Sequence, residues 1–156
     1  MNQNIHILVD ADSCPVKEEI FKVSARHEIS VTVVSNCFLR IPDRRLIEQI
    51  VVSSDFDAAD DYIATRANSK SVVVTADILL ADRCLKAGAT VVGPNGTLFT
   101  HNSIGAAKAT RAIMEDLRAS GLQTGGAPPF SKADRSRFLS ELHDAIVRIK
   151  RGLKIP

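Results

Sequence analysis

The sequence has no tryptophan, one tyrosine and six phenylalanines, so it offers few aromatic side chains on which nucleic-acid bases could stack. No hydrophobic run approaches the ~20 residues that cross a bilayer, and the first one, residues 5–9, is too short for a signal peptide and has no basic leader. The three cysteines include no CxxC pair, which argues against a disulfide framework and a thiolate zinc site. We expect a cytoplasmic protein without a membrane partner.

Neither sign of charge dominates. The formal net charge is +2 and charged residues make up 24% of the chain, so no global attraction to nucleic acid is expected and any basic surface must be local. With 156 residues, 45% of them hydrophobic, the chain can bury its apolar surface around one core. We expect a single domain over residues 1–156. Composition leaves the oligomeric state open.

Short β-branched runs alternate with helical patterns along the first two thirds of the chain. Such runs, without alternation of polar and apolar residues, suit strands that are buried on both faces. They lie at residues 5–9, 31–34, 49–52, 71–75 and 90–92. Strand and helix in alternation predict an α/β fold with a mostly parallel sheet flanked by helices.

Two helices are predicted around a loop rich in glycine and proline. Residues 102–120 follow a helical pattern, and a last helix covers residues 131–151. Between them, residues 121–130 (GLQTGGAPPF) hold three glycines and two prolines, too many for a regular element. We expect a flexible loop or lid, which could fold Lys132 and Arg135 over the sheet edge to bind substrate.

Acidic residues follow three of the predicted strands. Sites in parallel sheets form beyond the carboxyl ends of the strands, so these acids should gather at one edge. Residues three and four apart share a helix face, so the acids at 57, 60 and 61 should project together. The residues concerned are Asp10 and Asp12 after the first strand, Asp55, Asp57, Asp60 and Asp61 after the third, and Asp77 after the fourth.

Carboxylates at one edge repel each other, so a positive charge should offset them. Mg²⁺ and Mn²⁺ prefer carboxylate oxygens as ligands, and such ions assist the attack of water on phosphate esters. We interpret Asp10, Asp60 and Asp77 as catalytic metal ligands. The wider ligand set adds Asp12, Asp57 and Asp61, and Ser13, Ser35, Asn36 and Thr75 could bind substrate in the same pocket.

Helix capping is the competing interpretation of each single aspartate. Asp77 could cap its own helix, as could Asp55 or Asp57, since aspartate is among the best N-cap residues. For the whole set at one edge we favour a site over capping. Asp82 lies well around the helix from Asp77, and we expect it to face solvent.

The first acidic corner is harder to explain by capping. Ser13 or Cys14 could cap the first helix with Pro15 in its opening turn. That assignment leaves Asp10 and Asp12 without a structural role, which favours a functional one.

Five stretches of the chain resemble the YaiI/YqxD family of uncharacterised bacterial proteins. They are VDADSCPVK, SSDFDAADDYIA, VVVTADILLADRCLKAGA, GPNGTLFTHNSIGAAKATRAIMEDLRASG and GGAPPFSKADRSRFLSELHD, and they cover nearly the whole length. The family usually has a proline where this chain has Leu79. It is placed near the PIN and NYN nuclease-like domains, so the resemblance implies a PIN/NYN-like fold with an acidic metal site. It implies Asp10, Asp60 (or its neighbours) and Asp77 as the main acids and Asp12 as an auxiliary ligand.

We therefore predict a Mg²⁺- or Mn²⁺-dependent nuclease that hydrolyses phosphodiesters, with RNA favoured over DNA. A non-catalytic RNA- or protein-binding module on the same fold is the first alternative, and it would dispense with metal. Its basic contacts could come from FLRIPDRRL, from Lys108 and Arg111, or from Lys132, Arg135 and Arg137 after the loop. For the arginines of FLRIPDRRL a solvated face is the favoured interpretation. The second is a haloacid-dehalogenase-type phosphatase with Asp10 as nucleophile and Asp12 as general acid. The order of the later acids argues against it, because the Asp60-Asp61 pair precedes Thr75.

Overall fold

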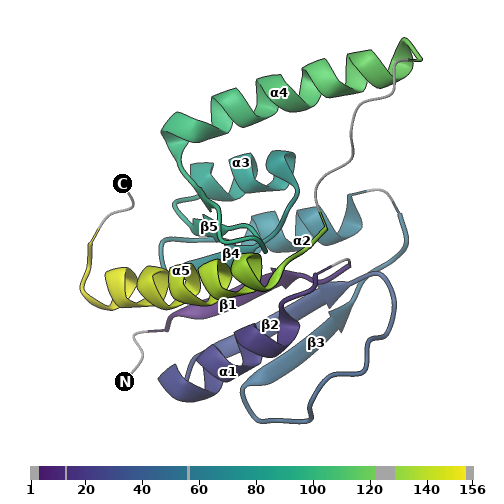
Figure 1. Ribbon diagram of the computed structural model, residues 1–156. Coiled ribbons are helices and arrows are strands. Elements are labelled where there is room, and N and C mark those ends of the chain that lie inside the picture. The colour runs from purple at the N-terminus through teal and green to yellow at the C-terminus, as the bar shows by residue number, and fades with distance from the viewer. Residues whose placement is uncertain (1–3, 13, 56, 122–128, 154–156) are drawn as a thin grey trace.

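One six-stranded sheet organises the chain (Figure 1). The computed structural model describes residues 4–12, 14–55, 57–121 and 129–153. The strand order is β3-β2-β1-β4-β5-β6, and every neighbouring pair is parallel except β5 and β6. The strands are β1 (His6–Asp10), β2 (Ser30–Ser35), β3 (Ile47–Val51), β4 (Ser71–Val74), β5 (Thr90–Val92) and β6 (Leu98–Phe99). The predicted α/β class with a mostly parallel sheet is confirmed, and the architecture is consistent with a PIN-like fold.

Helices cover both faces of the sheet (Figure 1). On one face α1 packs against α5, and on the other α2 packs against α3, with α4 outside α3. The helices are α1 (Lys17–His27), α2 (Ala58–Arg66), α3 (Ile78–Lys86), α4 (His101–Ala119) and α5 (Lys132–Lys150). Within the described ranges, no helix has the length and apolar character needed to cross a membrane.

The central strand β1 shows why apolar runs form this sheet. Ile7 and Val9 belong to the core cluster under α1 and α5, whereas Leu8 belongs to the cluster under α2 and α3. Successive side chains of a strand point to opposite faces, so a strand buried on both sides needs apolar residues at every position. Polar residues are thereby pushed to the ends of the strands, where the sheet meets solvent.

The last helix begins where the sequence predicts, and the first does not. Ser131, the predicted start of the last helix, is the N-cap residue of α5, and its side chain accepts from Asp134 N. The predicted capping of the first helix by Cys14 is wrong: Val16 is the N-cap residue of α1, without a side-chain capping bond, and Cys14 is buried. Ser13 and residues 122–128 of the predicted loop lie outside the described residues.

Candidate metal and substrate site

The candidate site lies where β1 and β4 end. Strands β2 and β3 lie on one side of β1, whereas β4 and β5 lie on the other, so the order of the chain reverses between β1 and β4. A crevice forms beyond the carboxyl ends of the strands at such a reversal. Asp10 is the last residue of β1, and Asp77 caps the helix that follows β4. The topology therefore brings the acids after the first and fourth strands to one place.

A pocket of about 570 Å³ opens at this edge. Five of the six predicted ligands line it: Asp10, Asp12, Asp57, Asp60 and Asp77. Asn36, predicted to bind substrate, lines it as well, and its backbone N–H donates to Asp12 Oδ2 at 3.1 Å. Three separate segments of the chain thus deliver carboxylates to a single cavity.

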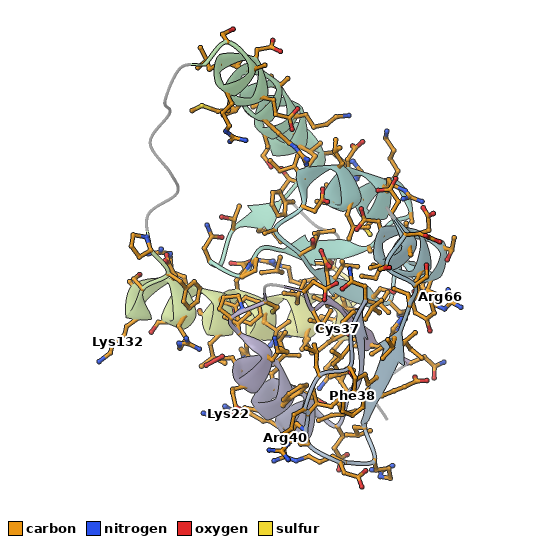
Figure 2. All side chains as sticks on the ribbon, turned by 90° about the vertical axis from the view of Figure 1, so that its right-hand side faces the viewer. Lys22, Cys37, Phe38, Arg40, Arg66 and Lys132 are labelled. Carbon is orange, nitrogen blue, oxygen red and sulfur yellow. The ribbon has the colours of Figure 1, made fainter. Side chains whose placement is uncertain are left out.

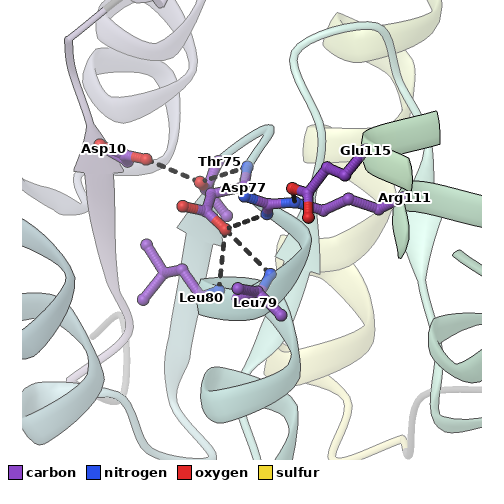
Figure 3. Close-up of polar contacts among 7 residues, drawn as sticks. All are labelled: Asp10, Thr75, Asp77, Leu79, Leu80, Arg111 and Glu115. Atoms are coloured by element: carbon purple, nitrogen blue, oxygen red, sulfur yellow. Dashed lines mark hydrogen bonds and ion pairs between the residues drawn. The ribbon is translucent and has the colours of Figure 1, made fainter. Parts of the chain in front are cut away.

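Asp10 and Asp77 are linked through Thr75 (Figure 3). The Thr75 hydroxyl donates to Asp10 Oδ2 at 2.8 Å and accepts the backbone N–H of Asp77 at 3.0 Å. Burial raises the pKa of Asp10, the Thr75 hydrogen bond lowers it, and the charges of Asp77 and Asp12 raise it again, with a net increase. Thr75 does not line the pocket, but it orients a carboxylate that does.

Asp77 is both a helix cap and a pocket residue. Its Oδ1 atom accepts the backbone N–H groups of Leu79 at 2.9 Å and Leu80 at 3.3 Å, so the capping interpretation is confirmed for this residue. The same Oδ1 atom accepts from Arg111 Nη1 at 3.2 Å. Figure 3 shows the other carboxylate oxygen on the side of Asp10. Capping uses one oxygen only, so it does not compete with a second role for Asp77.

The pKa of Asp60 is raised by its surroundings in the pocket. Burial raises its pKa first, followed by the charges of Asp77, Asp10 and Asp57, while Arg83 lowers it; the resulting value is about 6. Asp60 lies in the first turn of α2, after Asp57 at the N-cap position. Asp57 has a φ of 68° and its side chain makes no capping bond. The acids of α2 and of the two strand ends therefore share one electrostatic environment.

Asp61 is separated from its neighbours on α2. Its Oδ1 atom pairs with Arg83 Nη1 at 2.9 Å, its side chain is 63% exposed, and it does not line the pocket. The expected common face for Asp57, Asp60 and Asp61 thus divides, because α2 turns Asp61 toward α3 instead of toward the strand ends. The position of Arg83 beside Asp61 results from the packing of α2 on α3, and no sequence pattern predicts it.

Of the other predicted substrate-binding residues, those that the structure describes do not line the pocket. Ser35 is buried and donates to the carbonyl of Cys37 at 2.6 Å. Arg135 pairs with Glu19 of α1 at 2.7 Å, and Lys132 begins the same helix, α5. The expected folding of these two basic residues over the acidic edge is not seen, because Glu19 holds Arg135 on the α1 face.

Two other arginines supply positive charge to the pocket in place of Lys132 and Arg135. Arg83 from α3 and Arg111 from α4 line the pocket. Arg111 also pairs with Glu115, four residues later on α4, at 3.0 Å. Both positions depend on how α4 packs on α3 and how α3 packs on α2, so sequence periodicity alone could not place them.

Asp82 does not face solvent, so the expectation for this residue is wrong. Its side chain is only 14% exposed and pairs with Lys86 at 3.0 Å and Lys108 at 3.2 Å. These ion pairs lower its pKa, the hydrogen bond from Lys86 most of all. Lys108 reaches Asp82 from α4, so this acid fastens α4 to α3 and lies outside the pocket.

The donor set of the pocket fits a hard divalent cation. Its acids offer only oxygen ligands, and Mg²⁺ usually takes one or two protein carboxylates and keeps several waters. Among the residues that the structure describes, no three His, Cys, Asp or Glu side chains are gathered closely enough to form a metal site as they stand. An ion would therefore be held by few carboxylates directly and by others through water.

The fold and the pocket define an α/β protein of PIN-like architecture with an acidic sheet edge. The family described as "Uncharacterized BCR, YaiI/YqxD family" matches residues 8–148, and the chain belongs to this family. The resemblance inferred from the sequence is thereby confirmed.

Similar proteins cover nearly the whole chain. A UPF0178 protein of Sphingopyxis alaskensis is 68% identical over 148 residues, which cover 94% of this chain and 96% of the relative. A UPF0178 protein of Nitrobacter winogradskyi is 55% identical over 148 residues, covering 95% and 94%. UPF0178 protein RPA2191 of Rhodopseudomonas palustris is 53% identical over 150 residues, covering 96% and 95%. These names state no activity, so a function must be argued from the site.

Proposed function

We propose that the protein is a Mg²⁺- or Mn²⁺-dependent nuclease that hydrolyses phosphodiester bonds at the acidic pocket, with RNA as the substrate favoured over DNA. One observation carries the proposal: Asp10, Asp60 and Asp77 reach the same cavity from β1, α2 and the start of α3. Crowded acids are costly unless a positive charge offsets them, and perturbed carboxylates in a cleft are typical of functional sites. The raised pKa of Asp60 supports this reading.

The proposal gives each pocket acid a role. One or two of Asp10, Asp60 and Asp77 would bind the ion directly, and the remaining pocket acids, Asp12 and Asp57 among them, would contact its waters. Bound there, Mg²⁺ or Mn²⁺ would lower the pKa of a water molecule and neutralise charge on the phosphoryl oxygens. Thr75 keeps Asp10 in place.

The two pocket arginines would contact the substrate. Arg83 and Arg111 line the pocket, and a guanidinium matches the geometry of phosphate oxygens. Each is already paired with an acid, Arg83 with Asp61 and Arg111 with Asp77. Exposed pairs of this kind are weak, so a phosphate could draw either arginine away at little cost.

A cleavage assay tests the proposal. Labelled single-stranded RNA and DNA are incubated with the wild type, Asp10→Asn and the control Asp144→Asn, each with Mg²⁺, with Mn²⁺ and with EDTA; Asp144 is an exposed acid of α5 outside the pocket. We expect cleavage by the wild type and by Asp144→Asn only with metal, and at least a hundredfold less by Asp10→Asn. Absence of cleavage by the wild type under all conditions would overturn the proposal.

The non-catalytic alternative has one contact in its favour. Arg111 already offsets part of the charge of Asp77 without any metal, at 3.2 Å. A module of that kind would bind RNA equally well in EDTA and in Mg²⁺ and would cleave nothing.

We expect the protein to act in the cytoplasm, whether it is a nuclease or a binding module. This compartment is reducing, which suits the free thiols of Cys14, Cys37 and Cys84.

A further inference from the structure

We propose that the loop after β2, residues 36–46, binds single-stranded nucleic acid beside the acidic pocket by stacking a base on Phe38. This inference takes from the proposed function only the nature of the substrate and adds a site for it that the acidic residues do not provide. It concerns binding, which requires neither metal nor cleavage.

Phe38 is unusually open to solvent for a phenylalanine. It is 80% exposed, more than any other large hydrophobic residue in the part of the chain that the structure describes. Its neighbours Leu39 and Ile41 pack against the core. In Figure 2, Cys37, Phe38 and Arg40 are labelled on the face toward which β1 and β2 point in Figure 1. The loop therefore turns its aliphatic side chains inward and leaves an aromatic ring outside.

Hydrogen bonds hold the backbone on both sides of Phe38. Before it, Ser35 Oγ donates to the carbonyl of Cys37 at 2.6 Å. After it, the Gln49 side chain accepts the N–H of Leu39 at 2.7 Å and donates to its carbonyl at 2.9 Å. Gln49 belongs to β3 and Ser35 ends β2, so the loop is fastened to the sheet. A ring presented in this way loses little conformational freedom when it binds a ligand.

The position of Phe38 links it to the pocket. The loop begins at Asn36, which lines the cavity and donates its N–H to Asp12. Phe38 is two residues further on, and two residues of extended chain span at most about 7 Å. A base stacked on this ring would therefore lie next to the rim of the pocket, with its strand close to the acidic wall.

The charges favour a further contact outside the pocket. The acids of the pocket repel a polyanion, so groups outside it would add to the contacts of Arg83 and Arg111 with the strand. Arg40 is exposed on the same loop, and it forms no ion pair with another residue of the described ranges. Aromatic stacking together with arginine contacts to phosphate is the usual combination for single strands.

Fluorescence anisotropy with labelled oligouridylate, and with a duplex RNA of the same length, tests the inference in EDTA. The variants are Phe38→Ala, Phe38→Leu and Phe38→Tyr, and the matched control is Ile113→Ala, a 59% exposed residue of α4. A lost stacking contact lowers affinity by roughly 5- to 150-fold. We expect such a loss for Phe38→Ala and Phe38→Leu on the single strand, near-wild-type binding for Phe38→Tyr and Ile113→Ala, and no effect on the duplex. Circular dichroism checks that each variant is folded.

Two results would overturn the inference. One is equal single-strand affinity for the wild type and Phe38→Ala, and the other is absence of wild-type binding at low salt. Because no metal is present, the outcome is independent of the cleavage assay. Phe38-dependent binding by a protein that never cleaves would support the stacking site and reject the nuclease.

Discussion

The hydroxyl of Thr75 donates a hydrogen bond to Asp10 Oδ2 at 2.8 Å, across the boundary between β4 and β1. The same hydroxyl oxygen accepts the N–H of Asp77, so one buried side chain sets the positions of two of the three proposed metal ligands. Strand pairing brings Thr75 and Asp10 together. Val9 lies opposite Val74; Asp10 is the next residue and ends β1, and Thr75 directly follows the last residue of β4. The acidic edge is thus built into the sheet itself.

Replacing Thr75 with valine keeps the shape of the side chain and removes the hydroxyl. Asp10 Oδ2 and the Asp77 N–H then lose their partner, and an unsatisfied group of this kind costs about 1–3 kcal/mol of unfolding free energy. We expect Thr75→Val to show that loss in urea unfolding and to bind Mn²⁺ more weakly, while Thr75→Ser stays close to the wild type. Equal behaviour of the two variants would show that the hydroxyl has no such role.

The raised pKa of Asp60 predicts a pH-dependent stability. Its ordinary value is 3.8 and its folded value is about 6, so the folded state holds an extra proton between these pH values. The metal-free protein should therefore lose stability as the pH rises through this range. Because water in the open pocket screens these charges, the expected loss of unfolding free energy is only about 1 kcal/mol. For a chain of this size that corresponds to about 2–4 °C in Tm.

Thermal unfolding of Asp60→Asn checks this directly. The variant cannot ionise at that position, so it should unfold at a higher Tm than the wild type at pH 7.5 and at about the same Tm at pH 4. Mg²⁺ should narrow the difference at pH 7.5 by stabilising the wild type. An identical difference at both pH values would mean that Asp60 is not perturbed by its neighbours.

The guanidinium of Arg111 should compete with a metal ion for Asp77. It lies 3.2 Å from Asp77 Oδ1, so Arg111→Gln should remove a positive charge that offsets this carboxylate. A pair with this exposure is worth about 0.2–1 kcal/mol, which corresponds to a gain of roughly 1.5- to 5-fold in Mn²⁺ affinity by calorimetry. Arg118→Gln, an exposed residue further along α4, is the control and should change nothing. Weaker Mn²⁺ binding by Arg111→Gln would contradict the competition.

The sequence predicts best those strands whose side chains are buried on both faces of the sheet. Strands β1, β2, β4 and β5 are buried on both faces, and their unbroken apolar runs predict them closely. β3 starts two residues earlier than its pattern, because at the edge of the sheet its residues are only partly buried. β6 has two residues and no period to detect.

The residues of the site also differ in whether the sequence alone could place them. Asp10 and Asp77 could be placed because strand ends meet at one edge of a parallel sheet. Asp60 and Asp61 could not be distinguished, since the direction of each depends on how α2 begins after Asp57 and packs on α3. Arg111 required the packing of α4, which no local pattern fixes.

Calorimetric titration of Mn²⁺ into the metal-free protein at pH 7.5 tests the central claim most directly. Three proteins are compared: the wild type, Asp10→Asn, and Asp61→Asn as the matched control, whose carboxylate pairs with Arg83 but does not itself line the pocket. We predict saturable binding by the wild type and Asp61→Asn, with an affinity at least tenfold lower for Asp10→Asn. Absence of binding heat in the wild type, or equal binding by all three proteins, would contradict a metal site at the acidic edge.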